Sequence, residues 1–547
     1  MLGLTAGAPI SAAVTRAAVV YRAAPYLHVV TTGGAGVADI VVYGGELAGV
    51  AAALTAARRA DPGTRVTLVF PEGFPGGMAT VGSHCGWEIR QWLHAGRRAT
   101  PQGGSFARWL QATGPIYSPG AFAALLSDEL AQAGVTVLAG HELEAVHPRA
   151  AEGARPPRNR SRKARNRTIT EVGAIAVRPV DAAADPVLVD GEPLVLAGDL
   201  FVDGSATGRL LRLAGGAYSV GRSDWNPDGR QMVASLLVAV EGLDWEALTA
   251  ARDSQDRPVW GTASEDGPGG TRRTFWGGAG IAANDAVLAS FAAAHPGFRV
   301  GPPRGWEEAS GTFWISALLV YSVDGRRRAY DAGTDRDLDV GPVKTRDLDT
   351  AYREAVSIAT SSDMLGALRR FPGLGTARLA VDGERPRCAA MLLLRETIHG
   401  TAPGPEPFAV KVEDMTGAGS GPTDGIDSRH HNRRIGLGFY WPENAGYTHG
   451  EVVRTTAAAP NPTYLPLDAI LVPPVQNVLV PGYAARIESR AWWALRATPN
   501  QCVLGDAAGA AAALSLHEGV PLLRFATPEV AALHSWLTGE GVILNKW

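Results

Sequence analysis

Cysteine, charge and long apolar runs are all scarce in this chain of 547 residues. The three cysteines, Cys85, Cys388 and Cys502, are too few for a disulfide framework and suit a reducing compartment, so we expect a cytoplasmic protein. No C-x-x-C pair occurs, which argues against a structural zinc site, and we expect no bound metal. No run of 18 apolar residues occurs either, so no transmembrane helix is expected.

Charged residues make up only 19% of the chain, and the formal net charge is −3. This balance provides no basic field that would draw the protein to nucleic acid or to an anionic membrane, so neither partner is expected. The chain also lacks a Gly-x-Ser-x-Gly elbow and a glycine loop ending in Gly-Lys-Ser/Thr, the motifs of hydrolases and nucleotide triphosphatases.

Glycine and proline are the residues in excess, with 66 and 37 copies. Together they exceed the roughly 12% that is usual for globular proteins. They follow no fixed period, which excludes a collagen-like fibre, and they are spread along the whole chain. With 46% apolar residues, an ordinary globular value, the composition predicts a folded protein with many tight turns.

The first clear structural pattern is a strand, a glycine turn, a helix and a second strand. Residues 38–43 read as a buried strand, glycines follow at positions 44, 45 and 49, and an Ala-rich helix runs to about Ala60. Asp61-Pro62-Gly63 ends this helix, and residues 65–70 form a second apolar strand. Such a βαβ unit predicts a parallel sheet.

The rest of the chain divides into regular and irregular stretches. Residues 216–465 read as helical patterns among irregular segments rich in glycine, proline and tryptophan. Elsewhere the pattern predicts helices at 119–134 and 500–518, strands at 135–138, 172–178, 194–203, 467–472 and 478–480, and within the irregular part helices at 284–294 and 346–370.

Two segments are expected to lie outside the folded core. Residues 1–36 are Ala-rich and lack the basic start and long apolar stretch of a signal peptide, so we expect a loose or locally helical extension. Residues 155–167 hold seven Arg or Lys among thirteen positions, within a loop predicted over 150–168. A nucleic-acid patch is the alternative, but no aromatic residue is interleaved for base stacking, which favours a solvated loop.

The glycine turn is the sharpest local signal for binding. Gly44 ends the strand in a tight turn, backbone N–H groups at the helix start face an anion, and Gly49 lets helix and sheet approach. The G-x-G-x-x-G fingerprint is incomplete, because Glu46 stands where the second glycine is expected. Phe70 stands where an acidic residue is expected to hold ribose hydroxyls, with Glu72 two positions later.

The run 38–82, which ends in Pro75-Gly76-Gly77-Met78-Ala79-Thr80, resembles the N-terminus of FAD-dependent oxidoreductases of the glutathione-reductase-like superfamily. Three later segments resemble the same family: 200–210, which contains Asp203-Gly204-Ser205-Ala206-Thr207-Gly208, and the C-terminal segments 477–483 and 495–509. The segment 378–399 is similar to the family's substrate domain, though less closely. Glu46, Phe70 and Tyr483 are departures from the family pattern.

The resemblance implies an α/β fold, with an FAD-binding Rossmann-like parallel sheet of the glutathione-reductase type and a second, α+β substrate or cap domain. It divides the chain into an extension 1–36, a discontinuous FAD domain over 37–215 and 466–547, and the cap over 216–465. It further implies FAD as the cofactor, with these residues around it: Gly44, Gly45, Glu46, Ala48, Gly49, Phe70, Glu72, Gly76, Gly77, Met78, Asp203, Gly204, Thr207, Gly208, Gly482, Pro499, Asn500 and Gly505.

The helix that begins near Pro499 and Asn500 would aim its positive end at the flavin pyrimidine, where it would stabilise the negative charge of reduced flavin. His84 and Cys85 follow the Gly-Gly-Met segment; either could be joined covalently to the flavin, act as acid or base, or simply pack.

Further catalytic candidates lie in the predicted cap. Arg387 and Arg395 could clamp a substrate carboxylate, and His399 could transfer a proton, as could His430 and His431. Adjacent histidines do not share a helix face, so we do not expect His430 and His431 to bind a metal.

The expected function is oxidation of a small organic substrate by hydride transfer to flavin N5, with O₂ or a redox partner as the electron acceptor. A flavin monooxygenase is an alternative within the class. An alternative of another class is a family member that keeps the fold but binds FAD weakly or not at all and acts as a scaffold or binding protein; Glu46 and Phe70 favour it.

Overall fold

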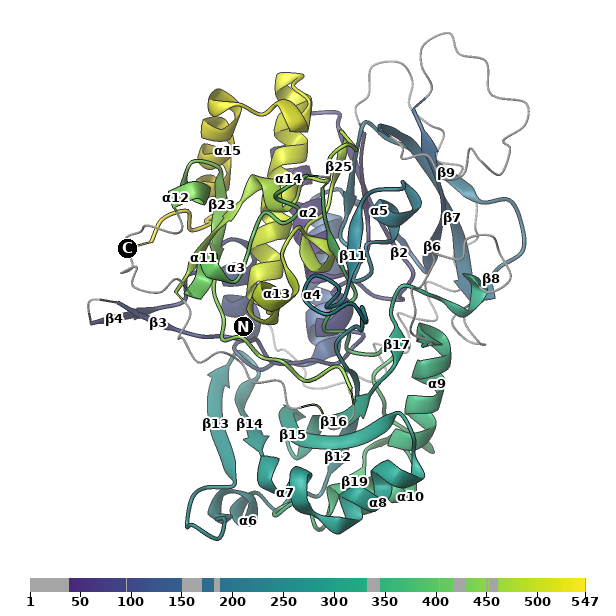
Figure 1. Ribbon diagram of the computed structural model, residues 1–547, viewed down its shortest axis with the longest axis vertical. Helices are drawn as coiled ribbons and strands as arrows, with labels where there is room; N and C mark the ends of the chain where they lie inside the picture. Colours follow the sequence, from purple (N-terminus) through teal and green to yellow (C-terminus); the bar gives the residue numbers. More distant parts are fainter. Residues whose placement is uncertain are drawn as a thin grey trace, which may run out of the picture.

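The computed structural model describes residues 39–94, 96–149, 170–181, 187–331, 345–402, 404–416, 428–448, 451 and 461–546. Two regions of different architecture lie one above the other, a parallel sheet with its helices and an antiparallel sheet with a group of short helices (Figure 1). The fold is therefore α/β with an additional α+β region, in agreement with the fold class predicted from the sequence. The predicted extension 1–36 and the predicted basic loop 150–168 lie outside the described residues.

The parallel sheet has five strands in the order β25-β10-β1-β2-β5. Its strands are apolar and largely buried because helices and a second sheet cover both faces. β25 comes from the C-terminal part of the chain and pairs with β10, so chain segments nearly 280 residues apart meet in one sheet. The strands are β1 (Asp39–Tyr43), β2 (Arg65–Phe70), β5 (Thr136–Ala139), β10 (Leu200–Asp203) and β25 (Val478–Leu479).

Two long helices cross on one face of this sheet, α2 (Leu47–Arg59) and α14 (Thr498–Glu518) (Figure 1). Their backbones touch at two glycines of α14. A Cβ on Gly505 would lie 2.3 Å from the carbonyl oxygen of Ala48, and a Cβ on Gly509 would lie 2.2 Å from that of Ala52. Because only glycine permits this approach, α14 fixes the position of α2 and of the turn that precedes it.

An antiparallel excursion follows the first βαβ unit and packs on one face of the parallel sheet. It consists of β6 (His141–Pro148), β7 (Val172–Asp181), β8 (Val187–Leu188) and β9 (Leu194–Ala197). Neighbouring elements of the same region are α3 (Ser105–Thr113), α4 (Pro119–Gln132), α5 (Arg209–Leu213), α13 (Ser489–Leu495), α15 (Thr527–Gly539) and the short strands β3 (Trp92–His94) and β4 (Arg97–Ala99).

The second region is built on a six-stranded antiparallel sheet in the order β13-β14-β15-β16-β12-β19. Its strands are β12 (Ala234–Glu241), β13 (Trp260–Gly267), β14 (Gly270–Gly277), β15 (Phe298–Ala309), β16 (Thr312–Val320) and β19 (Arg378–Leu379). Its helices are α6 (Trp245–Ala250), α7 (Ala279–Asn284), α8 (Ala286–Ala294), α9 (Leu348–Ala359) and α10 (Ser362–Leu368).

The remaining elements are short. The strand pairs are β11 (Tyr218–Val220) with β22 (Ile398–Gly400), β17 (Val323–Asp324) with β18 (Arg346–Asp347), β20 (Val381–Asp382) with β21 (Arg385–Pro386), and β23 (Arg434–Gly438) with β24 (Thr463–Pro466). The short helices are α11 (Glu413–Thr416), α12 (Ser428–His431) and the 3₁₀ turns η1 (Gly77–Ala79), η3 (Ala329–Asp331), η4 (Leu467–Ala469), η5 (Gly482–Ala484) and η6 (Leu522–Arg524).

Two local predictions were wrong. The apolar run 467–472 is not a strand: it begins as the 3₁₀ turn η4, and Pro473-Pro474 end it, so a short apolar run here fills the core without joining a ladder. The stretches read as irregular include four long strands, β13 to β16. Glycine and proline interrupt the alternating pattern that indicates a strand. In β15, Gly301-Pro302-Pro303 lie at a register shift.

No helix in the described part of the chain is long and apolar enough to cross a membrane.

Candidate active site

The turn between β1 and α2 forms the floor of the first candidate site. Gly44 has φ +106°, and a Cβ there would lie 2.3 Å from the backbone nitrogen of Ser205. A side chain at this position would therefore both strain the turn and displace the β10 loop. Gly49 and Gly204 pack against the same turn, so these two glycines hold helix to sheet instead of opening space for a ligand.

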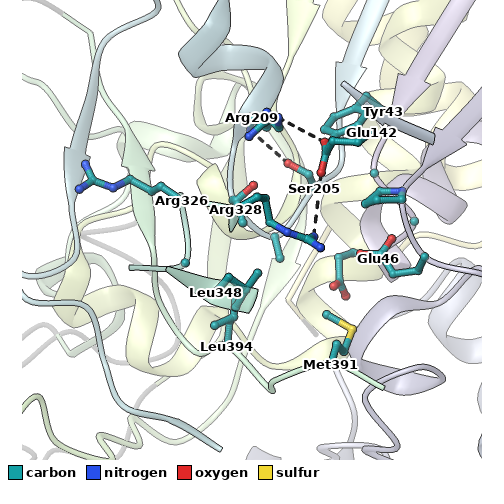
Figure 2. A pocket seen from close by; sticks show the side chains of 17 residues that line it. Tyr43, Glu46, Glu142, Ser205, Arg209, Arg326, Arg328, Leu348, Met391 and Leu394 are labelled. Atoms are coloured by element: carbon teal, nitrogen blue, oxygen red, sulfur yellow. Dashed lines mark hydrogen bonds and ion pairs between the residues drawn. The ribbon is translucent and has the colours of Figure 1, made fainter. Parts of the chain in front are cut away.

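A cavity lies at the carboxyl ends of β1, β2 and β10 (Figure 2). Predicted residues on its wall are Gly44, Gly45, Glu46, Glu72 and Thr207; the wall also includes Tyr43, Glu142, Arg209, Arg326, Arg328, Met391 and Leu394, which the sequence reading did not assign to it. In open parallel sheets ligands bind at this end of the strands. The position therefore matches a dinucleotide site.

Acidic groups crowd this cavity. Glu46 is buried, and its carboxyl accepts a hydrogen bond from the backbone N–H of Met78 at 3.0 Å. Burial, with Glu72 adding to it, raises the pKa of Glu46 to about 8. Burial also raises the pKa of Glu72 to about 7, although Arg328 opposes that rise. Glu46 is therefore mostly neutral at pH 7.

Arginines from two parts of the chain balance the acids. Arg209 pairs with Asp331 at 2.8 Å and with Glu142 at 3.2 Å. Arg328 comes from the second region, pairs with Asp349 at 2.8 Å, and brings a nitrogen to 4.0 Å from Glu142. Figure 2 shows the Arg328 side chain reaching into the cavity towards Glu142. A cation therefore stands near the carboxyls where a phosphate would otherwise meet only negative charge.

Phe70 does not replace the expected acidic residue in function. Its ring is buried and packs against Gly45, where a Cβ would lie 2.8 Å from the ring. It has no acceptor for a ribose hydroxyl, whereas Glu72 lies on the cavity wall. Asp203 uses both carboxylate oxygens within its own turn, accepting from Ser205 Oγ at 2.6 Å and from the backbone N–H of Leu211 at 2.9 Å.

The remaining predicted cofactor residues lie around the turns and helices that frame the cavity. Gly76, Gly77 and Met78 form the turn under Glu46, and a Cβ on Gly77 would lie 2.2 Å from Glu46 Cδ. The others are in packing positions: Gly208 lies against Ile398, Gly482 against Ala48, and Gly505 against the Ala48 backbone; Asn500 accepts from Gln102 at 2.7 Å, and Pro499 lies in the first turn of α14.

FAD, the cofactor implied by the sequence resemblance, fits these residues. Gly44, Gly45 and Glu46 of the glycine turn line the cavity. Glu46 is the exception to the pattern, but its raised pKa removes most of its charge at neutral pH, and Arg328 supplies a positive charge nearby. Glu72 is placed to accept ribose hydroxyls in place of Phe70.

A second group of polar side chains lies between the N-terminus of α14, the loop after η1 and β15. His84 is 5% exposed and its ring meets Trp306 edge-on, with 4.6 Å between centroids. Among the described residues no side chain or backbone group hydrogen bonds to its ring. Burial lowers the pKa of His84 to about 4, with Arg304, Arg395 and Arg496 adding to the effect and Glu88 opposing it. The imidazole is therefore neutral at pH 7.

Charged residues surround His84. Glu88 accepts a hydrogen bond from the backbone N–H of Thr498 at 2.9 Å, so a carboxylate caps the N-terminus of α14. Although burial alone would raise it, the pKa of Glu88 is lowered by His84, Arg496 and that N–H. Arg496 lies 3.9 Å from Glu88 and 3.9 Å from Glu443. The sequence reading missed Glu88, Arg304, Arg496 and Glu443, since they come from four distant segments with no common motif.

Cys85, Arg387 and His399 were the other catalytic candidates. Cys85 is buried, and burial raises the pKa of its thiol far above the usual range. Arg387 is held by Glu308 at 2.7 Å and lies over the ring of Trp314. His399 is fully buried and pairs with Glu396 at 2.8 Å. The structure brings neither Arg387 nor His399 into contact with His84.

The sequence model described as "FAD dependent oxidoreductase" matches residues 39–533. No curated protein sequence matches the chain significantly. Among solved structures, the myxobacterial chondrochloren halogenase CndH is 13% identical, with a TM-score of 0.36, and the alignment covers 91% of this chain and 78% of the halogenase. A geranylgeranyl bacteriochlorophyll reductase-like protein from Thermoplasma acidophilum is 10% identical, with a TM-score of 0.35 and coverage of 93% and 85%.

Proposed function

The chain belongs to the FAD-dependent oxidoreductase family, and we propose that it oxidises a small organic substrate by hydride transfer to FAD. When bound, FAD accepts the hydride at N5 and later passes both electrons to O₂ or to a redox partner. An oxidoreductase of this family requires a substrate and an electron acceptor. The remaining steps concern what the side chains of this protein do.

The observation that carries the proposal is that the His84 side chain is buried, uncharged and without a hydrogen-bonding partner among the described residues. A neutral imidazole can accept the proton of a substrate hydroxyl or amine. As the carbon–hydrogen bond gives up a hydride, the proton on the neighbouring oxygen or nitrogen passes to His84, and a C=O or C=N bond forms. One hydride and one proton leave the substrate, so the oxidation balances.

The position of His84, in the loop that leaves the η1 turn, supports this proposed role. Its backbone N–H donates to the carbonyl oxygen of Met78 at 3.0 Å, and Tyr483 donates to the sulfur of Met78 at 3.5 Å. The residues proposed to hold FAD are the backbone of Gly44 and Gly45, with Glu72 and Arg328 on the cavity wall. All three cysteines are unpaired, which suits work in a reducing compartment such as the cytoplasm.

Glu46 favours a second candidate function. Its carboxyl accepts a hydrogen bond from the backbone N–H of Met78, a donor that an anionic ligand would otherwise use. In this alternative the protein keeps the fold, binds FAD weakly and acts as a scaffold or binding protein. The two proposals differ in one property, the affinity for FAD. Nothing in the site favours oxygen insertion by a monooxygenase over hydride transfer.

Colour is the direct test. Purified protein, or protein incubated with FAD and passed through a desalting column, is expected to be yellow with the absorbance bands of bound flavin. Reduction of those bands by a substrate without O₂, followed by their return in air, would establish the oxidase reaction. Protein that stays colourless after incubation with FAD would refute the oxidoreductase proposal and support the scaffold.

A further inference from the structure

Arginine outnumbers carboxylate in the polar cluster around His84. Three guanidinium groups, Arg304, Arg395 and Arg496, face two carboxylates, Glu88 and Glu443. We propose that this arginine cluster binds the carboxylate of the substrate, so that the enzyme oxidises a small organic acid. The inference rests on the proposed function, because it names the substrate class of the same site.

Arg395 is the central observation. It donates to two neutral acceptors, the carbonyl oxygen of Val233 at 2.9 Å and Ser235 Oγ at 3.2 Å. No carboxylate among the described residues lies within 4 Å of its guanidinium. Buried charges in proteins are normally paired, since removal from water is costly. Burial, with Arg496 adding to it, lowers the pKa of Arg395 to about 10, so it is still a cation at pH 7.

The other two arginines are only loosely paired. Arg304 and Arg496 approach Glu443 at 4.0 and 3.9 Å, and Arg496 approaches Glu88 at 3.9 Å. These distances are too long for hydrogen bonds to the carboxylates. Arg304 hydrogen bonds to Tyr440, and Arg496 donates to the backbone oxygen of Glu443 at 3.4 Å, which leaves further guanidinium N–H groups unused. Arg496 Nε is buried without a hydrogen-bond partner. The cluster therefore has donors to spare for an additional acceptor.

The charge balance indicates a single negative charge on the ligand. Three arginines against two glutamates leave one positive charge, and His84 is neutral at pH 7. A monocarboxylate would neutralise this excess, and its two oxygens match the planar fork of an arginine. A phosphate group, with a charge of about −1.5 to −2 at pH 7, would exceed it.

The cluster is open to a ligand. Four of its side chains keep part of their surface exposed, from 10% for Glu88 to 35% for Glu443, with Arg496 and Arg304 between them. Arg387, the partner that the sequence suggested for Arg395, is engaged by Glu308 and is not needed for the clamp. A carboxylate held by Arg395 would keep the rest of the substrate beside His84, which accepts the proton.

The test measures carboxylate binding to the FAD-loaded protein by titration calorimetry. The probes are acetate, lactate and benzoate, their amides acetamide, lactamide and benzamide, and inorganic phosphate. We expect at least one carboxylate to bind, with its amide at least about tenfold weaker, the loss expected for a charge-assisted hydrogen bond. Arg395→Gln should weaken that carboxylate by about tenfold or more, and Arg395→Lys should retain part of the affinity.

Two further variants keep the test decisive. Arg304→Gln changes a half-buried side chain, so it should weaken binding even if Arg395→Gln fails to fold. Arg378→Gln is the matched control, because Arg378 is exposed and pairs with Glu241 on β12, and it should leave binding unchanged. Flavin content and melting temperature show whether each variant is folded.

Three outcomes would overturn the proposal: equal affinity for carboxylates and amides, tighter binding of phosphate than of every carboxylate, or unchanged binding in folded Arg395→Gln and Arg304→Gln. Yellow protein that binds none of the carboxylates leaves the oxidoreductase function standing and refutes the substrate class. Colourless protein that binds carboxylate through Arg395 refutes the oxidoreductase function and leaves the carboxylate site standing.

Discussion

The carboxyl group of Glu46 accepts a hydrogen bond from the backbone N–H of Met78, with 3.0 Å between oxygen and nitrogen. This contact spans from the helix that follows β1 to the η1 turn, and it lies over Gly77, where no side chain would fit. A negative charge here would oppose a bound pyrophosphate. The protonation of Glu46 therefore sets how strongly this site attracts a dinucleotide.

We expect the affinity for FAD to fall as the pH rises through about 8. Burial raises the pKa of Glu46 to about 8, so its carboxyl is mostly neutral at pH 6.5 and ionised at pH 9. The ionised form repels the pyrophosphate. A shift of one unit in the pKa of Glu46 on FAD binding corresponds to a loss of about tenfold in the affinity for FAD. Fluorescence titration of FAD into the apoprotein at the two pH values measures this change in affinity.

Glu46→Gln should remove most of this pH dependence, because the amide keeps the shape and carries no charge. Glu241→Gln, at an exposed acid of the second region, serves as the control and should behave like the native protein. An equal FAD affinity of the native protein at pH 6.5 and 9 would contradict the role of Glu46.

The free energy of unfolding of the FAD-free protein should also fall between pH 6 and 9. Burial raises the pKa of Glu46 to about 8 and of Glu72 to about 7, against 4.5 in the unfolded chain. The stabilisation is complete below pH 4.5 and is lost as the pH rises through 7 and 8, because the folded chain then releases protons that the unfolded chain has already released. Urea unfolding at pH 6, 7, 8 and 9 measures the trend.

The double variant Glu46→Gln/Glu72→Gln should show a flatter profile over the same range. His84 acts in the opposite direction, but only between about pH 4 and 6.5, since burial lowers its pKa. The range from pH 7 to 9 therefore excludes the contribution of His84. A native profile that rises over this range would show that another group controls stability.

His84→Gln should keep flavin absorbance and lose turnover by about 10² to 10⁴-fold, the usual contribution of a general base. Because burial lowers the pKa of His84 to about 4, the native enzyme should hold its kcat/KM down to about pH 4 on the acid side. His517→Gln, at an exposed histidine paired with Asp61, is the control. An acid limb near pH 6.5, or a His84→Gln variant with native kcat, would exclude His84 as the base.

At most one of the three thiols should react in the folded protein. Cys85 and Cys502 are buried, and burial raises the pKa of both thiols, so neither forms the thiolate that reacts. Cys388 is half-buried, and burial raises the pKa of its thiol to about 11, so it should react slowly. A colorimetric thiol titration should count three thiols only after denaturation. Rapid reaction of Cys85 in the native state would restore it as a nucleophile.

The sequence predicted the parallel sheet well because its signals are local. A buried strand, a glycine turn and an Ala-rich helix follow one another within 39–70, and the structure has β1, α2 and β2 there. The antiparallel sheet was missed because its evidence is not local. The alternation in β15 is broken by Gly301-Pro302-Pro303, and its pairing with β14 and β16 makes it a strand.

The candidate site was predictable in part for the same reason. Gly44 and Glu46 lie in a contiguous motif, and the structure puts both on the cavity wall. Arg328 reaches that wall from the second region, and its only signal was a run of three arginines after Gly325. The sequence also could not separate glycines that face a ligand from those that pack helices, such as Gly505.

Gly509→Ala tests the role of the glycines that pack helices together. Gly509 lies inside α14 with helical backbone, so alanine adds no backbone strain, and its intrinsic helix propensity favours the change. The added Cβ would nevertheless lie 2.2 Å from the carbonyl oxygen of Ala52, so α2 and α14 must move apart. We expect a destabilisation of about 1–3 kcal/mol, the usual cost of overpacking, measured by urea unfolding. Gly366→Ala in α10 is the matched control, because no atom lies within 4 Å of its added Cβ, and it should be neutral or stabilising by up to about 1 kcal/mol. Because α2 carries the glycine turn at its start, Gly509→Ala should also weaken FAD binding without touching the cofactor. Equal stability of the two variants would show that the helices tolerate separation and that α14 does not fix the site.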